Sequence, residues 1–437
     1  MLWCLITIWF YLLCFLYFST VFLILCRLSW GRLPHLYLQC IERLQKELET
    51  MYPLGYFDRM PWSNLIDASD RHSLLHRTEH RDFEIVKEDL SPDLMDVQLQ
   101  LARAGVEAIV QDQLTSVFTL APAYQRNRLN WNLWRRLRPR PGLRVLWIAS
   151  TFVRFLFILP VRVALFLTSF LFVIVCCLVA GVVNFSDSSK TAIGVIYCRL
   201  YTAGSGLVCT YKDTHNRPKR PGIAVSNHLS PNDLMVICAD VPHDREYLYT
   251  VTGQSHNGII YAIEHLCERL CDALWLERTS AESRHNFMLQ VLERGKNAGP
   301  VIVFPEGYCT NNTQVLQFRR AVFDKDITIY PIAIKQNARY GDSYWFEDTI
   351  STYYLRQLAS WASVYEVTYL PAQRMKAGET SEQFAGARAA VDRGHDRHPA
   401  DRDKYKGIIQ KNIAEDLITS CPPSPTLTNS SVEFAYQ

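Results

Sequence analysis

Residues 227–233, Asn-His-Leu-Ser-Pro-Asn-Asp, decide the fold because they join an apolar run to the start of a helix. The run before them, Gly-Ile-Ala-Val-Ser at residues 222–226, predicts a short buried strand. Pro231 suits the first turn of a helix, so His228 is expected in the loop at the carboxyl end of that strand. Loops at this end of the strands carry chemistry in α/β folds, which makes residues 227–233 a candidate site.

His228 and Asp233 have the spacing of a general base and the acid that orients it. With Asp233 one turn into the helix, its carboxylate can reach one ring nitrogen while the other nitrogen faces a substrate hydroxyl. Such a pair needs no Ser or Cys nucleophile. The spacing alone is weak evidence, because His398 and Asp403 repeat it in a polar tail with no strand before it. A structural or solvated role for His228 therefore stays open.

Two further apolar runs end in polar residues. Residues 300–304, Pro-Val-Ile-Val-Phe, predict a strand that brings Glu306 and Gly307 to the same sheet edge. A carboxylate there can bind polyol hydroxyls, and glycine lets backbone N–H groups approach an oxyanion, although Pro-Glu-Gly is also an ordinary turn. Residues 273–277 end at Arg278, which is a candidate phosphate ligand or a surface ion-pair partner.

The order and spacing of these motifs resemble the glycerolipid acyltransferase superfamily, which includes the lysophosphatidic acid acyltransferases. The chain is most similar to the animal endoplasmic-reticulum glycerol-3-phosphate acyltransferases. The likeness covers roughly residues 95–390. Its motif positions are residues 105–109, 228–233, 275–278, 304–307, 311–313, 330–335, 341–342 and 360–362.

The resemblance implies an α/β fold with a mixed sheet and direct acyl transfer from fatty acyl-CoA to glycerol 3-phosphate. His228 and Asp233 are the expected catalytic residues, Arg278 is expected to hold the acceptor phosphate, and Glu306 to orient its hydroxyls. Gly307 and neighbouring N–H groups are expected to stabilise negative charge. Neither a metal nor a redox cofactor is expected, since acyl-CoA acts as a co-substrate. Two alternatives stay open, a lysophospholipid acyltransferase and a catalytically silent membrane scaffold.

Three positions depart from the family pattern. Tyr308 stands where a threonine usually follows the Glu-Gly pair, which puts a bulky phenol in the acceptor pocket. Arg319, Arg320 and Ala321 replace a lysine-rich stretch that contains glycine. Asn232 replaces the apolar residue usual before the aspartate. The acceptor is therefore less well determined by the sequence than the reaction class.

Two apolar segments predict an integral membrane protein. Residues 1–26 carry no charged side chain and are long enough to span a bilayer as a retained anchor. Residues 145–183 are apolar apart from Arg154 and Arg162, and we expect a hairpin or re-entrant element bent near Pro160, with one clean crossing as the competing interpretation. The catalytic domain is predicted at 195–390, with a linker at 27–144 and a polar, disordered tail at 391–437.

Basic residues set the expected orientation. Arginines and lysines follow the first apolar segment, which places the downstream side in the cytosol, at the endoplasmic-reticulum membrane by resemblance. Seven arginines between 126 and 144 form a basic collar with no acidic residue between Asp112 and Asp187. Their position beside tryptophans and an apolar segment favours anionic membrane lipids over nucleic acid, as does the net charge of only +3. The thirteen cysteines show no paired framework, so we expect reduced thiols.

Overall fold

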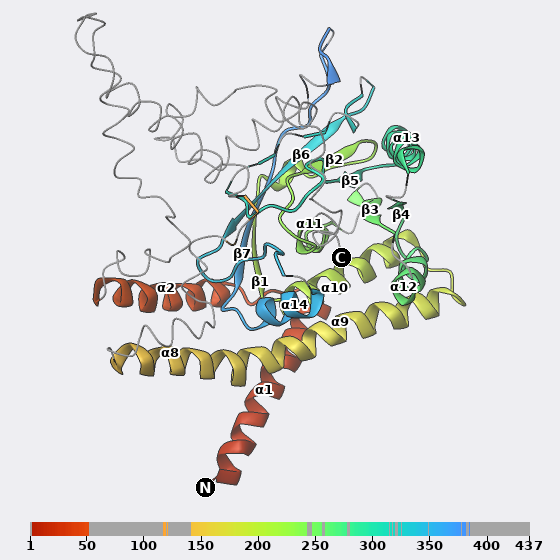
Figure 1. Ribbon diagram of the computed structural model, residues 1–437. Helices are drawn as coiled ribbons and strands as arrows, with labels where there is room; N and C mark the ends of the chain where they lie inside the picture. The colour runs from red at the N-terminus through yellow and green to blue at the C-terminus, as the bar shows by residue number, and fades with distance from the viewer. Residues whose placement is uncertain are drawn as a thin grey trace, which may run out of the picture. The chain divides into compact units, whose positions relative to one another are not determined.

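The computed structural model describes the chain in two compact units, residues 31–119 and the rest of the chain. The residues that it describes are 2–51, 117–118, 120, 141–242, 247–255, 258–277, 280–313, 315–316, 318–319, 322–324, 326–347, 349–376, 378–381 and 384. The smaller unit contributes α2 (Leu33–Met51). The larger unit contains the sheets and all other helices named below (Figure 1).

The main sheet is mixed, as the sequence predicts, and its strand order is β1-β7-β6-β2-β5. Among the described strands of this sheet, β6 and β7 pair antiparallel and the other neighbours pair in parallel. A second sheet pairs β3 with β4 in parallel. The strands are β1 (Leu207–Lys212), β2 (Ile223–Ser226), β3 (Val251–Gln254), β4 (Ala273–Leu276), β5 (Val301–Val303), β6 (Ile329–Asn337) and β7 (Ser363–Tyr369).

Helices cover the sheet because both faces of its central strands are apolar. In β2, Ala224 packs into one core cluster while Ile223 and Val225 pack into another, as the alternation of side chains along a strand requires. The first cluster includes residues of α10 and α11, and the second includes residues of α13. The helices of this body are α10 (Asp187–Gly204), α11 (Asn232–Ala239), α12 (Ile259–Cys267), α13 (Ala281–Asn297) and α14 (Ile350–Leu358), with the short turn η3 (Thr214–Asn216).

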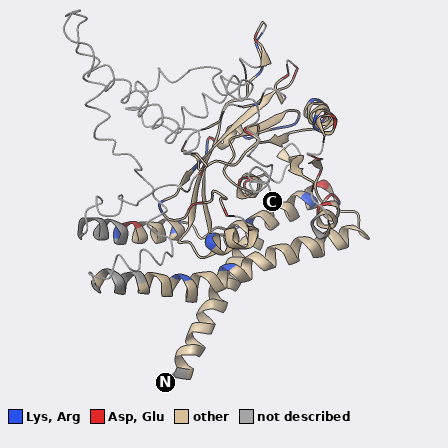
Figure 2. Ribbon diagram, in the orientation of Figure 1, with Lys and Arg blue, Asp and Glu red and all other residues tan. Residues whose placement is uncertain are grey.

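In the part of the chain that the structure describes, two helices are long and apolar enough to cross a membrane, Trp3–Leu25 and Ile148–Ala180. The first lies within α1 (Leu2–Leu25), which Figure 2 shows without charged side chains. The second combines α8 (Pro141–Val153), the π-helical turn η2 (Arg154–Ile158) and α9 (Leu159–Ala180). The stretch 141–180 continues as one helix (Figure 1), so the expected hairpin does not reverse at Pro160. Whether this segment is re-entrant or crosses the membrane once stays a prediction.

The helix continues through Pro160 because its neighbours replace what proline removes. Proline lacks the N–H that would bond the carbonyl four residues earlier, here that of Leu156. Trp9 of α1 donates its Nε1 to this carbonyl oxygen at 3.0 Å. A second polar contact between these helices joins the hydroxyls of Tyr17 and Thr168 at 2.7 Å. Hydrogen bonds of this kind attach one apolar helix to another where hydrophobic burial gives no preference.

The chain reverses after α9, and α10 packs back along it (Figure 1). The contacts of Arg162, near the start of α9, explain how a charged residue is tolerated there. Its guanidinium donates to the carbonyl oxygens of Leu358, Ser360 and Trp361 at 3.0, 2.6 and 2.7 Å, which caps the end of α14. Gly206 makes room for it, since a Cβ there would lie 2.3 Å from the guanidinium carbon. Arg162 therefore fastens α9 to the α/β body at the end of α14.

Candidate active site

The loops that follow β2 and β5 meet at one edge of the sheet. These strands are neighbours and run parallel, with Val225 beside Val303, so their carboxyl ends deliver the next residues side by side. The backbone N–H of His228 donates to Oε1 of Glu306 at 2.7 Å. The expectation that His228 and Glu306 share one edge is therefore met by a direct hydrogen bond.

The imidazole of His228 is held by the carboxylate of Asp233. Its Nδ1 lies 2.9 Å from Asp233 Oδ2, and the ring stacks on Phe304 with centroids 4.4 Å apart. The Asp233 side chain is completely buried, whereas that of His228 is 22% exposed. An Nδ1–H that donates to a buried carboxylate leaves Nε2 as the nitrogen that can accept a proton from a substrate.

Asp233 is fixed in place by the backbone that precedes it. Its Oδ2 also accepts the N–H groups of Leu229 and Ser230, at 2.6 and 2.9 Å. Burial by itself lowers the pKa of His228, but the thiol group of Cys309 and the hydrogen bond to Asp233 raise it, and the pKa lies well above its ordinary value of 6.5. The neutral, basic form of His228 therefore increases as pH rises.

Glu306 connects two loops of the site. Its Oε1 accepts the His228 N–H, and its Oε2 accepts the N–H of Leu316 at 2.9 Å. Burial raises the pKa of Glu306 to about 7, while these two backbone hydrogen bonds act to lower it. Both carboxylate oxygens are thus committed to protein donors, so the geometry favours a positioning role. Its predicted contact with acceptor hydroxyls stays a prediction.

Gly307 has the left-handed backbone expected of glycine, with φ of +74°. Its N–H donates to the Phe304 carbonyl at 3.2 Å, so this group is used in the turn. The predicted contribution of Gly307 to an oxyanion stays a prediction. A Cβ at Gly307 would lie 2.9 Å from the guanidinium carbon of Arg319, which also sits 5.5 Å from the centre of the Tyr308 ring. A cation thus borders the Glu306 loop.

Several residues that support the site were not predicted. Asn227 extends the β2–β6 ladder, since its amide accepts from the Ile334 N–H and donates to the Ile334 carbonyl, both at 2.8 Å. The N–H of Thr310 donates to the His228 carbonyl at 2.9 Å. Asn227 lies within the motif of residues 227–233, so its polar side chain directly after a strand was the available signal. The pairing of Thr310 with His228 depends on tertiary structure.

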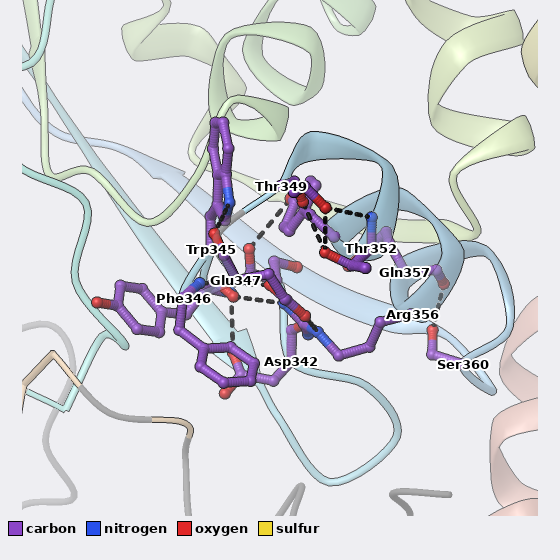
Figure 3. A network of polar contacts seen from close by, with 12 residues as sticks. Asp342, Trp345, Phe346, Glu347, Thr349, Thr352, Arg356, Gln357 and Ser360 are labelled. Atoms are coloured by element: carbon purple, nitrogen blue, oxygen red, sulfur yellow. Dashed lines mark hydrogen bonds and ion pairs between the residues drawn. The ribbon is translucent and has the colours of Figure 1, made fainter. Parts of the chain in front are cut away.

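The segment between β6 and α14 is braced around Arg356 (Figure 3). Arg356 pairs with Glu347 and donates to the carbonyl oxygens of Asp342 and Tyr344. The Asp342 carboxylate accepts from the Gln336 side chain at 2.7 Å and from the Tyr344 N–H at 2.9 Å. This network fastens the segment after β6 to α14, and it accounts for Asp342 of the Gly-Asp motif.

Some predicted residues lie outside the part of the chain that the structure describes. They are Arg278, residues 126–140 of the basic collar and the tail at 391–437. Their predicted roles stay predictions. Among the residues that are described, no three His, Cys, Asp or Glu side chains are placed to hold a metal ion. The site as described offers an oriented imidazole base at a sheet edge, with Arg319 nearby.

Comparison with known proteins gives a consistent set of relatives. The family model named Acyltransferase matches residues 208–335. "Glycerol-3-phosphate acyltransferase 3" of Rattus norvegicus is 30% identical over 392 residues, 84% of this chain and 81% of the relative. "Glycerol-3-phosphate acyltransferase 4" of Homo sapiens is 32% identical over 340 residues, 74% of this chain and 72% of the relative. The crystal structure of the 1-acyl-sn-glycerophosphate acyltransferase from Thermotoga maritima aligns with a TM-score of 0.40 at 15% identity, covering 55% of this chain and 95% of that one.

Proposed function

Because this chain belongs to the acyltransferase family of glycerolipid enzymes, we propose that it is an acyl-CoA-dependent sn-glycerol-3-phosphate 1-O-acyltransferase. The observation that carries the proposal is the His228 side chain, bonded at Nδ1 to Asp233 while its backbone bonds Glu306. The relatives named glycerol-3-phosphate acyltransferase support the choice of acceptor. The product is lysophosphatidic acid, a precursor of phospholipids and triacylglycerol.

The proposed reaction is direct transfer. Nε2 of His228 removes the proton from the sn-1 hydroxyl as that oxygen attacks the thioester carbonyl of acyl-CoA. Asp233 stabilises the imidazolium that forms, since its carboxylate already accepts from Nδ1. The tetrahedral intermediate collapses, the C–S bond breaks, and the imidazolium returns the proton to the departing CoA thiolate. The ester, free CoA and the neutral imidazole remain, so protons and electrons balance.

The acceptor phosphate needs cationic partners, for which Arg278 and Arg319 are the candidates. Arg278 is placed by its motif. Arg319 is supported by its position over the Tyr308 ring and against Gly307, one residue from Glu306. Backbone N–H groups of the Glu306 loop are candidates to stabilise the oxyanion.

A lysophospholipid acyltransferase is the second candidate function, and Tyr308 favours it. The Tyr308 side chain is 41% exposed where relatives of this type usually carry a small threonine. A half-exposed phenol two residues after Glu306 offers apolar surface to a lysolipid chain, which a threonine does not. A catalytically silent scaffold is a weaker third candidate, because the base and its carboxylate are in hydrogen-bonding contact.

The enzyme is proposed to reside in the endoplasmic-reticulum membrane with its catalytic body in the cytosol. The contacts of α9 support this orientation. Arg162 near its start bonds the end of α14, and the Cys177 carbonyl near its end accepts from Arg269 at 3.5 Å. We infer that a helix fastened to the body near both ends runs along it rather than across the bilayer. The body then stays on the side to which α1 leads.

The proposed function is tested by comparing acyl transfer to a panel of acceptors. Purified full-length protein in lipid nanodiscs receives radiolabelled acyl-CoA with glycerol 3-phosphate, lysophosphatidate or a neutral lysophospholipid. We expect transfer to glycerol 3-phosphate that disappears in His228→Ala. Transfer to lysolipids without transfer to glycerol 3-phosphate would establish a lysophospholipid acyltransferase instead. If no acceptor is acylated, the catalytically silent scaffold is the remaining candidate.

A further inference from the structure

We propose that Asn232 is a positioning residue, whose side-chain amide is held between two tyrosines and thereby fixes Asp233 against His228. The inference deepens the proposed function, since it assumes that His228 acts as the base. Asn232 is the first residue of α11 and directly precedes Asp233. It is also one of the three departures from the family pattern, where an apolar residue is usual.

The amide of Asn232 is completely buried and has a partner at each end. Tyr201 of α10 donates its hydroxyl to Asn232 Oδ1 at 2.9 Å. Asn232 Nδ2 donates to the Tyr353 hydroxyl of α14, also at 2.9 Å. Because the Tyr353 hydroxyl donates onward to the Ser343 carbonyl at 3.1 Å, it is an acceptor toward Asn232. This assigns the amide nitrogen to Tyr353 and the oxygen to Tyr201.

Each tyrosine is itself fixed by a different part of the protein. Tyr353 belongs to α14, which the Arg356 network braces (Figure 3). Tyr201 shares a hydroxyl–hydroxyl contact of 2.9 Å with Tyr354, and Phe166 of the apolar helix α9 packs against both rings at 5.4 and 4.9 Å. Asn232 is therefore anchored to α14 on one side and, through Tyr201, to the apolar helix α9 on the other.

The position of Asp233 depends on this anchor because its carboxylate must meet several donors at once. Asp233 Oδ2 accepts from His228 Nδ1 and from two backbone N–H groups. His228 is held independently of α11, because its backbone N–H donates to Glu306 and its ring stacks on Phe304. A small rotation of the first turn of α11 is therefore expected to lengthen the bond between Asp233 and the imidazole. Loss of the Asn232 amide is thus expected to weaken the His228–Asp233 hydrogen bond while leaving the overall fold intact.

The test uses Asn232→Leu, Tyr201→Phe and the double variant in full-length protein. We expect each single variant to lower kcat about tenfold, because small misplacements of reacting groups cost one to two orders of magnitude. The KM for acyl-CoA is expected to stay near the wild-type value. The double variant removes both members of the Tyr201–Asn232 hydrogen bond, so its kcat is expected to match the single variants rather than fall by the product of both.

A second readout follows His228 independently of turnover. Diethyl pyrocarbonate modifies neutral imidazole, so the pH midpoint of labelling at His228, measured by peptide mass spectrometry, reports its pKa. A weaker bond to Asp233 lowers that pKa, and Asn232→Leu is expected to shift the midpoint to lower pH. Tyr211→Phe is the matched control, since the Tyr211 hydroxyl bonds α11 at the Val236 carbonyl at 2.8 Å, away from the catalytic pair.

The outcomes separate the two proposals. A shifted midpoint in Asn232→Leu with an unshifted Tyr211→Phe supports positioning. Equal behaviour of the two variants, or multiplicative losses in the double variant, overturns it. If the wild-type protein transfers no acyl group to any acceptor, the proposed function fails, while the labelling midpoints still decide whether Asn232 holds the pair.

Discussion

Replacing Asp233 with asparagine isolates the charge of the catalytic pair from its geometry. Leu229 and Ser230 both donate backbone N–H groups to Oδ2, so an asparagine keeps its carbonyl oxygen at this position. The His228 Nδ1–H can still donate to that oxygen, and the tautomer of the imidazole is preserved. The amide nitrogen then takes the place of Oδ1, a buried atom with no hydrogen-bond partner in the described part of the chain.

The magnitude follows from what this variant loses. A hydrogen bond to a charged group contributes about 1.5–3 kcal/mol, and the charge on Asp233 acts mainly on the imidazolium formed during transfer. We therefore expect Asp233→Asn to lower kcat by about 10- to 150-fold. The buried, unpaired amide N–H is expected to reduce the free energy of unfolding by about 1–3 kcal/mol.

The pKa shift of His228 also predicts how the rate of each protein changes with pH. Hydrogen bonding to Asp233 helps to raise the pKa of His228, so the wild-type rate increases with pH as His228 loses its proton. In Asp233→Asn this rise is expected at lower pH, and the loss of activity is smaller at pH 6 than at pH 8. Initial rates of CoA release between pH 5.5 and 9, with thermal unfolding as the control for folding, measure both. The reasoning is refuted if the pH at which the rate rises is the same in Asp233→Asn and wild type, or if Asp233→Asn is as inactive as His228→Ala.

Three other variants test separate parts of the structure. The pKa of Glu306 is about 7 in the folded protein against an ordinary value of 4.5, so the wild-type unfolding temperature is expected to fall as pH rises from 4.5 to 7. Glu306→Gln is expected to remove this dependence of the unfolding temperature on pH, and the same dependence in both proteins would contradict the prediction. Tyr308→Thr is expected to raise activity on glycerol 3-phosphate relative to lysophosphatidate in the acceptor panel, and an unchanged ratio excludes Tyr308 from selectivity. Arg162→Met leaves three carbonyl groups without their donor and is expected to reduce the free energy of unfolding in detergent by about 1–3 kcal/mol, the cost of leaving a buried acceptor unpaired. Arg284→Met, at an exposed position of α13, serves as the control.

The elements that carry the site could be predicted from sequence because their signals are local. Residues 222–226 and 300–304 are short apolar runs bounded by turn residues, and the structure forms β2 and β5 within them. Pro231 marks the start of α11, which begins at Asn232. Parallel pairing of the two strands then brings His228 and Glu306 together. The meeting of these two residues therefore follows from local sequence patterns and the geometry of parallel strands.

Features that depend on distant partners could not be predicted in this way. Pro160 and the arginines suggested a bend in residues 145–183, but Trp9 supplies a donor to Leu156 and the end of α14 accepts the Arg162 guanidinium. Asn232 was noticed only as a departure from a pattern. Its meaning required Tyr201 and Tyr353, which lie 31 and 121 positions away in the chain.

The most direct measurement is single-turnover release of CoA by full-length protein in nanodiscs, comparing wild type with His228→Gln at saturating acyl-CoA and acceptor. Glutamine keeps a polar side chain beside Asp233 but cannot take up the hydroxyl proton. The account predicts a loss of about a thousandfold, the scale of general-base catalysis. A His228→Gln variant that keeps a substantial part of the wild-type rate, while folded as judged by thermal unfolding, would contradict it.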